Sequence, residues 1–163
     1  MSESEELGRG GRLRGAAAGE LVSAAFAAES AHGPRLAHGL SLADLAHAVA
    51  LVEGGDLQGD DAKALLRGLL ELHEIPGDAF PWDPALGDAF NSREDERDRR
   101  VGRSAAGWLS AGRPRREAFR VALRLTARAG ALELHDALVD QAAALAAHAR
   151  ETKTALATDY TYL

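Results

Sequence analysis

The spacing of apolar residues along the chain predicts a series of helices. Leucine, valine and alanine recur every three to four positions over residues 42–52 and again over residues 60–73, which is the period of one helix face. Gly54-Gly55 and Pro76-Gly77 follow these stretches and are expected to end both helices. Ser41-Leu-Ala-Asp44, a hydroxyl residue followed three positions later by an acid, has the form of a capping box and predicts that the first helix begins there.

Two further helices are expected on either side of this pair. One covers residues 16–31 and ends at Gly33-Pro34. The other opens at Asp83-Pro84, with the aspartate as N-cap and the proline in the first turn. Acids and bases alternate at helical spacing over residues 93–103, which is typical of a solvent-exposed, ion-paired face. A break is expected over residues 104–112.

The last part of the chain predicts one long helix. Between Pro114 and Arg150 there is no further proline and one glycine, Gly130. A helix of about 36 residues is about 54 Å long, whereas a compact chain of this length is about 40 Å across. Leu123 and Leu125 point about 200° apart on such a helix, so apolar residues occur all round it. We therefore infer burial in a bundle built partly from other chains or from residues outside this sequence; the alternative is two shorter helices broken at Gly130.

Composition narrows the fold class to all-α. The 163 residues include 35 alanines, the best helix formers, against 4 Phe, 2 Tyr and 2 Trp. The absence of cysteine excludes a disulfide scaffold, a cysteine nucleophile and a thiolate metal site. The six histidines form no ligand pair at i, i+4, so we expect no zinc site. We expect no other metal and no cofactor. No apolar run approaches the roughly 20 residues of a membrane span, and the acidic N-terminus is unlike a signal peptide, so a cytoplasmic protein is expected.

Charge is distributed unevenly along the chain. The net charge is −6, yet residues 93–128 contain 11 arginines and 5 acids. Arg113, Arg115 and Arg116 stand at the start of the long helix, where backbone N–H groups are also free, and this combination predicts an anion site. The alternative is that these arginines pair with local acids such as Glu117 or those in residues 94–98. A helical nucleic-acid binder would also use an arginine cluster, but the overall negative charge argues against nucleic acid as a partner.

One stretch of the chain resembles a known family. Residues 107–125, with Gly112, Arg113, Arg115 and the run Leu123-Arg124-Leu125, resemble the first signature block of argininosuccinate lyases, which belong to the fumarase/aspartase superfamily. Further segments resemble this family in the same order; they are residues 7–13, 43–48, 83–94 and 160–163.

The resemblance implies a fold, an assembly and a reaction. The fold is a helical N-terminal domain over residues 1–112, followed over residues 113–163 by the first, truncated long helix of a central bundle. The family assembles as homotetramers through that bundle, so a homo-oligomer, or a hetero-oligomer with a chain that supplies the rest of the bundle, is expected. The reaction is elimination of fumarate from an N-substituted aspartate, so the small-molecule partner is a dicarboxylate. The implied substrate-binding residues are Arg113, Arg115, Arg116, Asn91 and Ser30, and the implied catalytic residues are Thr161 and Tyr162.

The chain also departs from the family pattern. Phe90 and Tyr162 stand where the family has histidines, and a tyrosine with a reference pKa of about 10 is a poor base at neutral pH. Two hypotheses follow. The first is a partial or split chain of a lyase with a divergent substrate, inactive in isolation. The second is a non-catalytic relative that acts as an assembly or regulatory partner.

Overall fold

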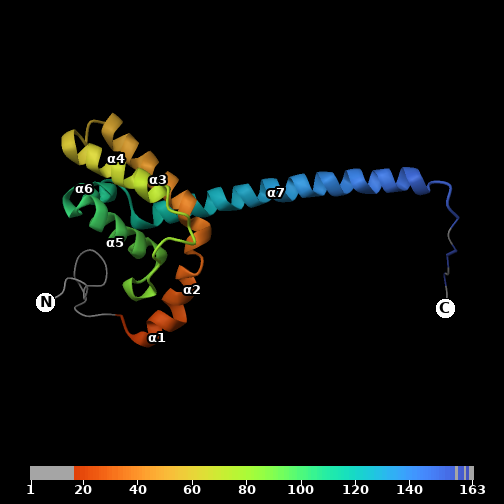
Figure 1. Ribbon diagram of the computed structural model, residues 1–163, viewed down its shortest axis with the longest axis horizontal. Helices are drawn as coiled ribbons and strands as arrows, with labels where there is room; N and C mark the ends of the chain where they lie inside the picture. The colour runs from red at the N-terminus through yellow and green to blue at the C-terminus, as the bar shows by residue number, and fades with distance from the viewer. Residues whose placement is uncertain (1–16, 157, 160, 162–163) are drawn as a thin grey trace. The chain divides into compact units, whose positions relative to one another are not determined.

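A computed structural model describes residues 17–156, 158, 159 and 161 (Figure 1). The elements in chain order are α1 (Gly19–Leu21), a π-helical turn η2 (Val22–Phe26), α2 (Ala27–Ser30), α3 (Gly33–Glu53), α4 (Gly59–His73), the 3₁₀ turn η3 (Pro84–Leu86), α5 (Ala89–Val101), α6 (Arg103–Gly107), the 3₁₀ turn η4 (Trp108–Ser110) and α7 (Arg115–Thr152). No strand occurs among the described residues, which confirms the predicted all-α fold. Two compact units divide at Thr126. The domain boundary expected after residue 112 stays a prediction.

Helix α3 begins nine residues earlier than the capping box predicts, with His32 rather than Ser41 as its N-cap. It starts at Gly33 with Pro34 in its first turn, where a missing N–H costs nothing. Gly33-Pro34 therefore opens α3 as well as following the end of α2. Ser41 and Asp44 lie inside α3 and are buried, so the prediction that they cap a helix is wrong. The predicted end is confirmed, because α3 stops at Glu53 before Gly54-Gly55.

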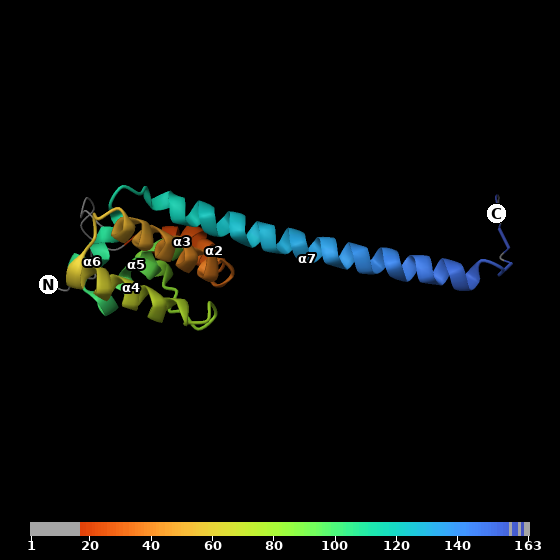
Figure 2. The same ribbon diagram turned by 90° about the horizontal axis from the view of Figure 1, so that it is seen from above.

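The core of the first unit lies between α3, α4 and α7. Leu65, Leu69 and Leu72 of α4 are almost fully buried and pack with Leu51 of α3 and Leu109 of η4. A second apolar cluster joins Leu36, Leu40 and Ala43 of α3 to Ala118 and Ala122 of α7. Figure 2 shows α3, α4 and α5 side by side in this unit. The two clusters place the N-terminal turns of α7 against α3.

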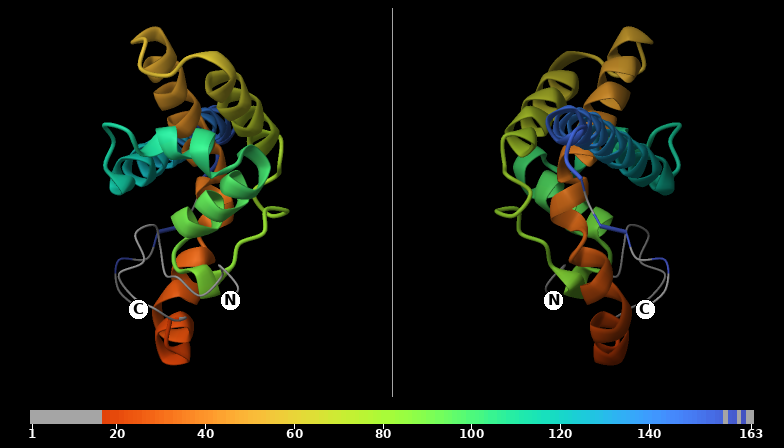
Figure 3. Two further views of the ribbon diagram at one scale, coloured as in Figure 1. Left: turned by 90° about the vertical axis from the view of Figure 1, so that its left-hand side faces the viewer. Right: turned by 90° about the vertical axis from the view of Figure 1, so that its right-hand side faces the viewer.

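The connection from α4 to α7 contains more helix than the sequence suggests. The side chain of Asp83 accepts a hydrogen bond from Ala85 N, but it caps only η3. Helix α5 begins later, at Ala89, where Asp88 is the N-cap. The break expected over residues 104–112 is largely helical, because α6 and η4 occupy most of it. Figure 3 shows α5 and α6 beside α4, and Gly68 of α4 allows Val101 of α5 to approach closely.

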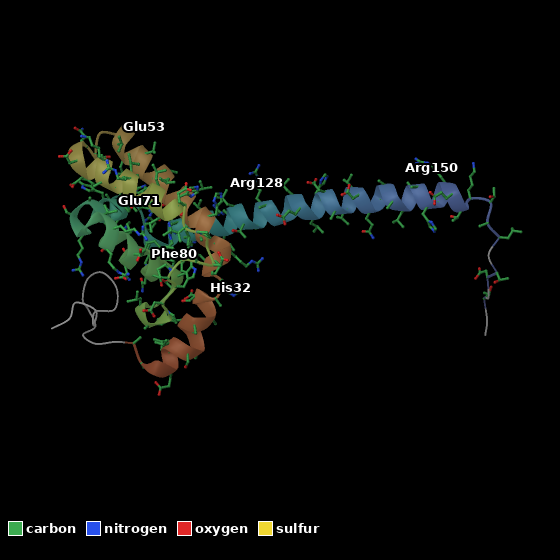
Figure 4. The ribbon with its side chains drawn as sticks, in the orientation of Figure 1. His32, Glu53, Glu71, Phe80, Arg128 and Arg150 are labelled. Carbon is green, nitrogen blue, oxygen red and sulfur yellow. The ribbon has the colours of Figure 1, made fainter. Side chains whose placement is uncertain are left out.

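Helix α7 is continuous through Gly130, so the alternative of two shorter helices is wrong. Its first turns pack tightly on α3: a Cβ on Gly39 would lie 2.7 Å from Ala122 Cα. Thr126 Oγ1 also donates a hydrogen bond to Arg35 O over 3.3 Å. In the second unit the side chains of α7 are exposed, and between the labelled Arg128 and Arg150 they project outward around the helix (Figure 4).

Helix α3 is long and apolar enough, by length and composition, to cross a membrane. The core helix of a soluble protein passes the same test. The inward face of α3 carries Ser41 and Asp44, which bind arginines of other elements, as described next. This face therefore packs inside the helical unit as a core helix does.

Candidate functional site

A pocket of 290 Å³ lies where the start of α7 meets α5 and η4. Its lining residues are Phe90, Asn91, Glu94, Leu109, Ser110, Arg113 and Arg115. Three of the residues predicted from the sequence, Asn91, Arg113 and Arg115, thus share one cavity although they come from two segments of the chain. The pocket combines two guanidinium groups, one carboxylate, an amide and a hydroxyl with the apolar side chains of Phe90 and Leu109.

Arg113 reaches the pocket from a buried ion network. Its Nη2 donates to Asp44 Oδ1 over 2.7 Å, and its Nη1 donates to Ala43 O over 3.2 Å. The other oxygen of Asp44 accepts from Arg93 Nη2 over 3.3 Å, and the same nitrogen donates to Ser41 Oγ over 3.1 Å. The side chains of Arg93, Asp44 and Arg113 are only 4%, 6% and 3% exposed. One carboxylate is therefore divided between two guanidinium groups in the interior.

The network carries more positive than negative charge. Within it, two buried arginines face one buried aspartate, and Glu117 is 3.7 Å from Arg113 Nε and half-exposed. The carboxylate of Glu94, which is bound to Arg97, also lines the pocket. An uncompensated buried charge is costly, so a site of this kind favours an anion beside it. Arg93 gains a further contact because its guanidinium lies 5.6 Å from the ring centroid of Phe80, which Figure 4 labels.

Arg115 is held at the rim of the pocket by the N-terminus of α5. Its Nη2 donates to Asp88 Oδ1 and, over 2.5 Å, to Asn91 Oδ1. Asp88 Oδ1 also accepts from Asn91 N as the N-cap of α5, so one oxygen serves both the helix and the arginine. The guanidinium lies 5.1 Å from the ring centroid of Phe90. About half of the Arg115 side chain stays exposed to solvent and is open to an anion.

Asn91 is oriented by the turn before α5. Its Nδ2 donates to Leu86 O over 2.6 Å, which leaves Oδ1 facing Arg115. Gly87 makes this possible: it has a φ of +111°, and a Cβ there would lie 2.3 Å from Asn91 Nδ2. Asn91 thus has a defined amide orientation at the pocket.

The other predicted site residues lie elsewhere. Arg116 is exposed and does not line the pocket. Ser30 is buried, and its hydroxyl has no hydrogen-bond partner in the described part of the chain, but it too lies outside the pocket lining. Thr161 is exposed, and Tyr162 lies outside the described residues. Their roles stay predictions.

The charged stretch of α5 differs from the solvent-exposed face that the sequence suggests. Ion pairs of α5 residues are present, with Arg97 bound to Glu94 and Arg100 bound to Glu96. However, Arg93, Glu96 and Arg97 are buried, because this face turns toward the interior of the first unit. On the exposed side, the hydrogen bond to Asp95 raises the pKa of the Arg99 guanidinium above its ordinary value.

The alternative that the arginines pair with local acids is borne out for Arg113, whose Nε lies 3.7 Å from Glu117 Oε2. The stronger partners, Asp44 and Asp88, were not expected from the sequence. Asp44 is 69 positions away from Arg113, so local spacing gives no signal for that pair. Among the described residues no group of three or more metal-ligating side chains is placed to hold a metal ion.

Comparison with known proteins relates the chain to argininosuccinate lyases. The argininosuccinate lyase of Methanocaldococcus jannaschii is 30% identical over 122 residues, which are 75% of this chain and 25% of that enzyme. That of Methanopyrus kandleri is 34% identical over 118 residues, or 72% and 22% of the two chains. That of Methanoculleus marisnigri is 32% identical over 139 residues, or 84% and 27%. No family model and no solved structure matches the chain.

The chain spans about a quarter of the length of these curated relatives. The matches agree with the resemblance noted in the sequence. Over about three quarters of its own length, this chain is a divergent relative of the argininosuccinate lyases.

Proposed function

We propose that this chain supplies the carboxylate-binding part of a C–N lyase site that eliminates fumarate from an N-substituted aspartate. The observation that carries the proposal is the pocket in which Arg113, Arg115 and Asn91 meet, with Arg113 bound to a buried aspartate that a second arginine shares. Arginine binds carboxylates with paired, charge-assisted hydrogen bonds, which suits a dicarboxylate substrate. The relationship to argininosuccinate lyases supports the reaction class.

Elimination of fumarate needs groups that bind the carboxylates of the substrate and groups that transfer protons. A base removes a proton from the carbon next to one carboxylate, the electron pair forms the C=C bond of fumarate, and the C–N bond breaks as the amine takes up a proton. In this proposal Arg115 and Asn91 bind one carboxylate, and Arg113 supports it from the buried side. Thr161 and Tyr162 remain the candidate catalytic residues. Arg116 and Ser30 are further candidates for binding.

We propose that the rest of the acid–base equipment comes from residues outside this sequence or from another chain of the assembly. The isolated chain is then expected to bind dicarboxylates without turning over. Steady-state assays with argininosuccinate, followed by the ultraviolet absorbance of fumarate, check this expectation. Fumarate release at an ordinary enzymatic rate by the purified chain contradicts it.

Binding is the direct test of the site. Succinate, the saturated analogue of fumarate, is titrated into the ¹⁵N-labelled chain and followed by NMR. Arg115→Gln is expected to weaken binding about tenfold or more, because it removes a charge-assisted hydrogen-bond donor. Arg120→Gln is the matched control: it is an exposed arginine of the same helix, outside the pocket lining, and is expected to stay within about twofold of the wild type. Absence of succinate binding by the wild type, or equal effects of the two variants, would falsify the carboxylate pocket.

A second candidate function is a non-catalytic assembly partner of a larger lyase. Two observations favour it: Arg113 and Arg115 are already held by Asp44 and Asp88, and the second unit exposes large apolar side chains on two opposite faces of α7. This candidate predicts that the chain co-purifies with a full-length lyase and that Arg113→Ala and Arg115→Ala leave the activity of that complex unchanged.

A further inference from the structure

We propose that Arg93, which does not line the pocket, sets the affinity of the pocket for anions by sharing Asp44 with Arg113. This inference rests on the proposed carboxylate pocket and names the residue that tunes it. Arg93 lies in α5, Asp44 in α3 and Arg113 just before α7, so the three side chains join three segments of the first unit.

The Asp44 carboxylate binds two arginines at once. Each of its oxygens binds a different guanidinium, Oδ1 to Arg113 over 2.7 Å and Oδ2 to Arg93 over 3.3 Å. If Arg93 were neutral, Asp44 and Arg113 would form a one-to-one pair, and the wall of the pocket would carry no excess charge from this network. With Arg93 charged, Asp44 compensates one arginine and the second positive charge remains.

The positive charge of Arg93 acts on the pocket although Arg93 itself lies outside the lining. Arg93 is buried and outside the pocket lining, whereas Arg113 is a lining residue. Arg93 takes up part of the negative charge of Asp44, so Asp44 neutralises Arg113 less completely at the pocket wall. Because the network is buried, water and salt screen this charge only weakly. Arg93 also has an Nε with no hydrogen-bond partner in the described part of the chain. An unsatisfied buried donor costs free energy, and a buried ion pair is by itself weak evidence of a stabilising role.

Replacing Arg93 by an apolar side chain of similar length tests the inference. In Arg93→Met the Asp44–Arg113 pair stays intact, and the unsatisfied Nε disappears. The succinate dissociation constant, measured by NMR titration of the full chain, is expected to rise about fivefold or more, because a positive charge near the anion is lost. Arg93→Lys keeps the charge and is expected to restore the affinity to within about threefold of the wild type.

Two controls separate this effect from general damage to α5. Arg100→Met removes an arginine of the same helix that binds Glu96 rather than Asp44, and it is expected to leave succinate affinity within about twofold. Circular dichroism checks that each variant is folded. If Arg93→Met does not fold, Arg93→Gln replaces it, because an amide keeps a polar contact to Ser41 and Asp44 without the charge and gives the same expected loss.

The outcomes distinguish this inference from the pocket itself. Weaker succinate binding in Arg93→Met, restored in Arg93→Lys, supports it. If Arg115→Gln loses binding while Arg93→Met keeps it within twofold, the carboxylate pocket stands and the role of Arg93 is overturned. Equal losses in Arg93→Met and Arg93→Lys show that shape rather than charge matters and also overturn it. A wild-type chain that does not bind succinate overturns both proposals.

Discussion

At the residue scale, Asp44 is the side chain on which most of the site depends. Its carboxylate joins α3 to α5 through Arg93 and to the start of α7 through Arg113, and its side chain is only 6% exposed. Breaking a buried ion pair costs more than the pair itself contributes, because the remaining charge stays without a partner. Here two guanidinium groups would lose that partner at once.

We therefore expect Asp44→Asn to lower the free energy of unfolding by about 3–5 kcal/mol. Loss of a helix cap alone would cost about 1 kcal/mol, so the size of the effect separates the buried network from the capping box. Urea denaturation followed by circular dichroism gives the value. Asp60→Asn is the control, since that aspartate is fully exposed beside Lys63 and a change within about 0.5 kcal/mol is expected. A similar small loss in Asp44→Asn would contradict the network.

At the element scale, the contact between α3 and α7 positions the arginines. Gly39 lets α7 approach so closely that an added Cβ would lie 2.7 Å from Ala122 Cα and 3.0 Å from its Cβ. The pocket needs this contact because Arg113 and Arg115 stand at the N-terminal end of α7. Gly130 in the same long helix has no neighbour within 4 Å of its added Cβ. The two glycines therefore have opposite expected responses to the same substitution.

We expect Gly39→Ala to destabilise the first unit by about 1–3 kcal/mol, because backbone atoms of α7 would have to move. Gly130→Ala is expected to stabilise α7 by about 0.5–1 kcal/mol, since alanine restricts the unfolded backbone and fits the helix. Urea denaturation measures the first effect, and thermal loss of far-ultraviolet helical signal measures the second. If Gly39→Ala and Gly130→Ala both raised or both lowered stability, the packing described for α3 and α7 would be contradicted.

At the scale of the whole molecule, the second unit has little interior of its own. Leu132, Leu134, Leu138, Val139 and Leu145 are each more than half exposed. At 100° per residue, Leu132 and Val139 lie on one face and Leu134, Leu138 and Leu145 on the opposite face. Two exposed apolar faces are typical of a helix that is covered by partners. This supports the proposal that the chain works in an oligomer whose other members complete a bundle.

We expect the full chain to self-associate in solution through this helix. Replacing both Leu134 and Leu138 by glutamate places two charges on neighbouring turns of one face, and it is expected to shift the chain toward monomer in sedimentation velocity. Gln141→Glu, an exposed polar position on the same helix, controls for the added charge. A monomeric wild type, or an unchanged oligomer in the double variant, counts against association through α7.

The sequence by itself determined the helices that depend on local interactions. The apolar period and the glycine pair correctly marked α4 and the end of α3, and the proline-free stretch after Pro114 correctly predicted one long α7. These features are readable because helix hydrogen bonds join residues four positions apart. The resemblance to argininosuccinate lyases also came from the sequence, and the relatives bear it out.

Only the tertiary structure decided which polar residues meet. Ser41 and Asp44 look like a helix cap in sequence, yet they bind arginines 52, 49 and 69 positions away. The sequence predicts that the charged residues of α5 are exposed to solvent. In the folded unit Arg93 and Arg97 are buried by other elements. The physical reason is that a long-range ion pair depends on how elements pack, and the periodicity within one helix carries no information about the charge that faces it.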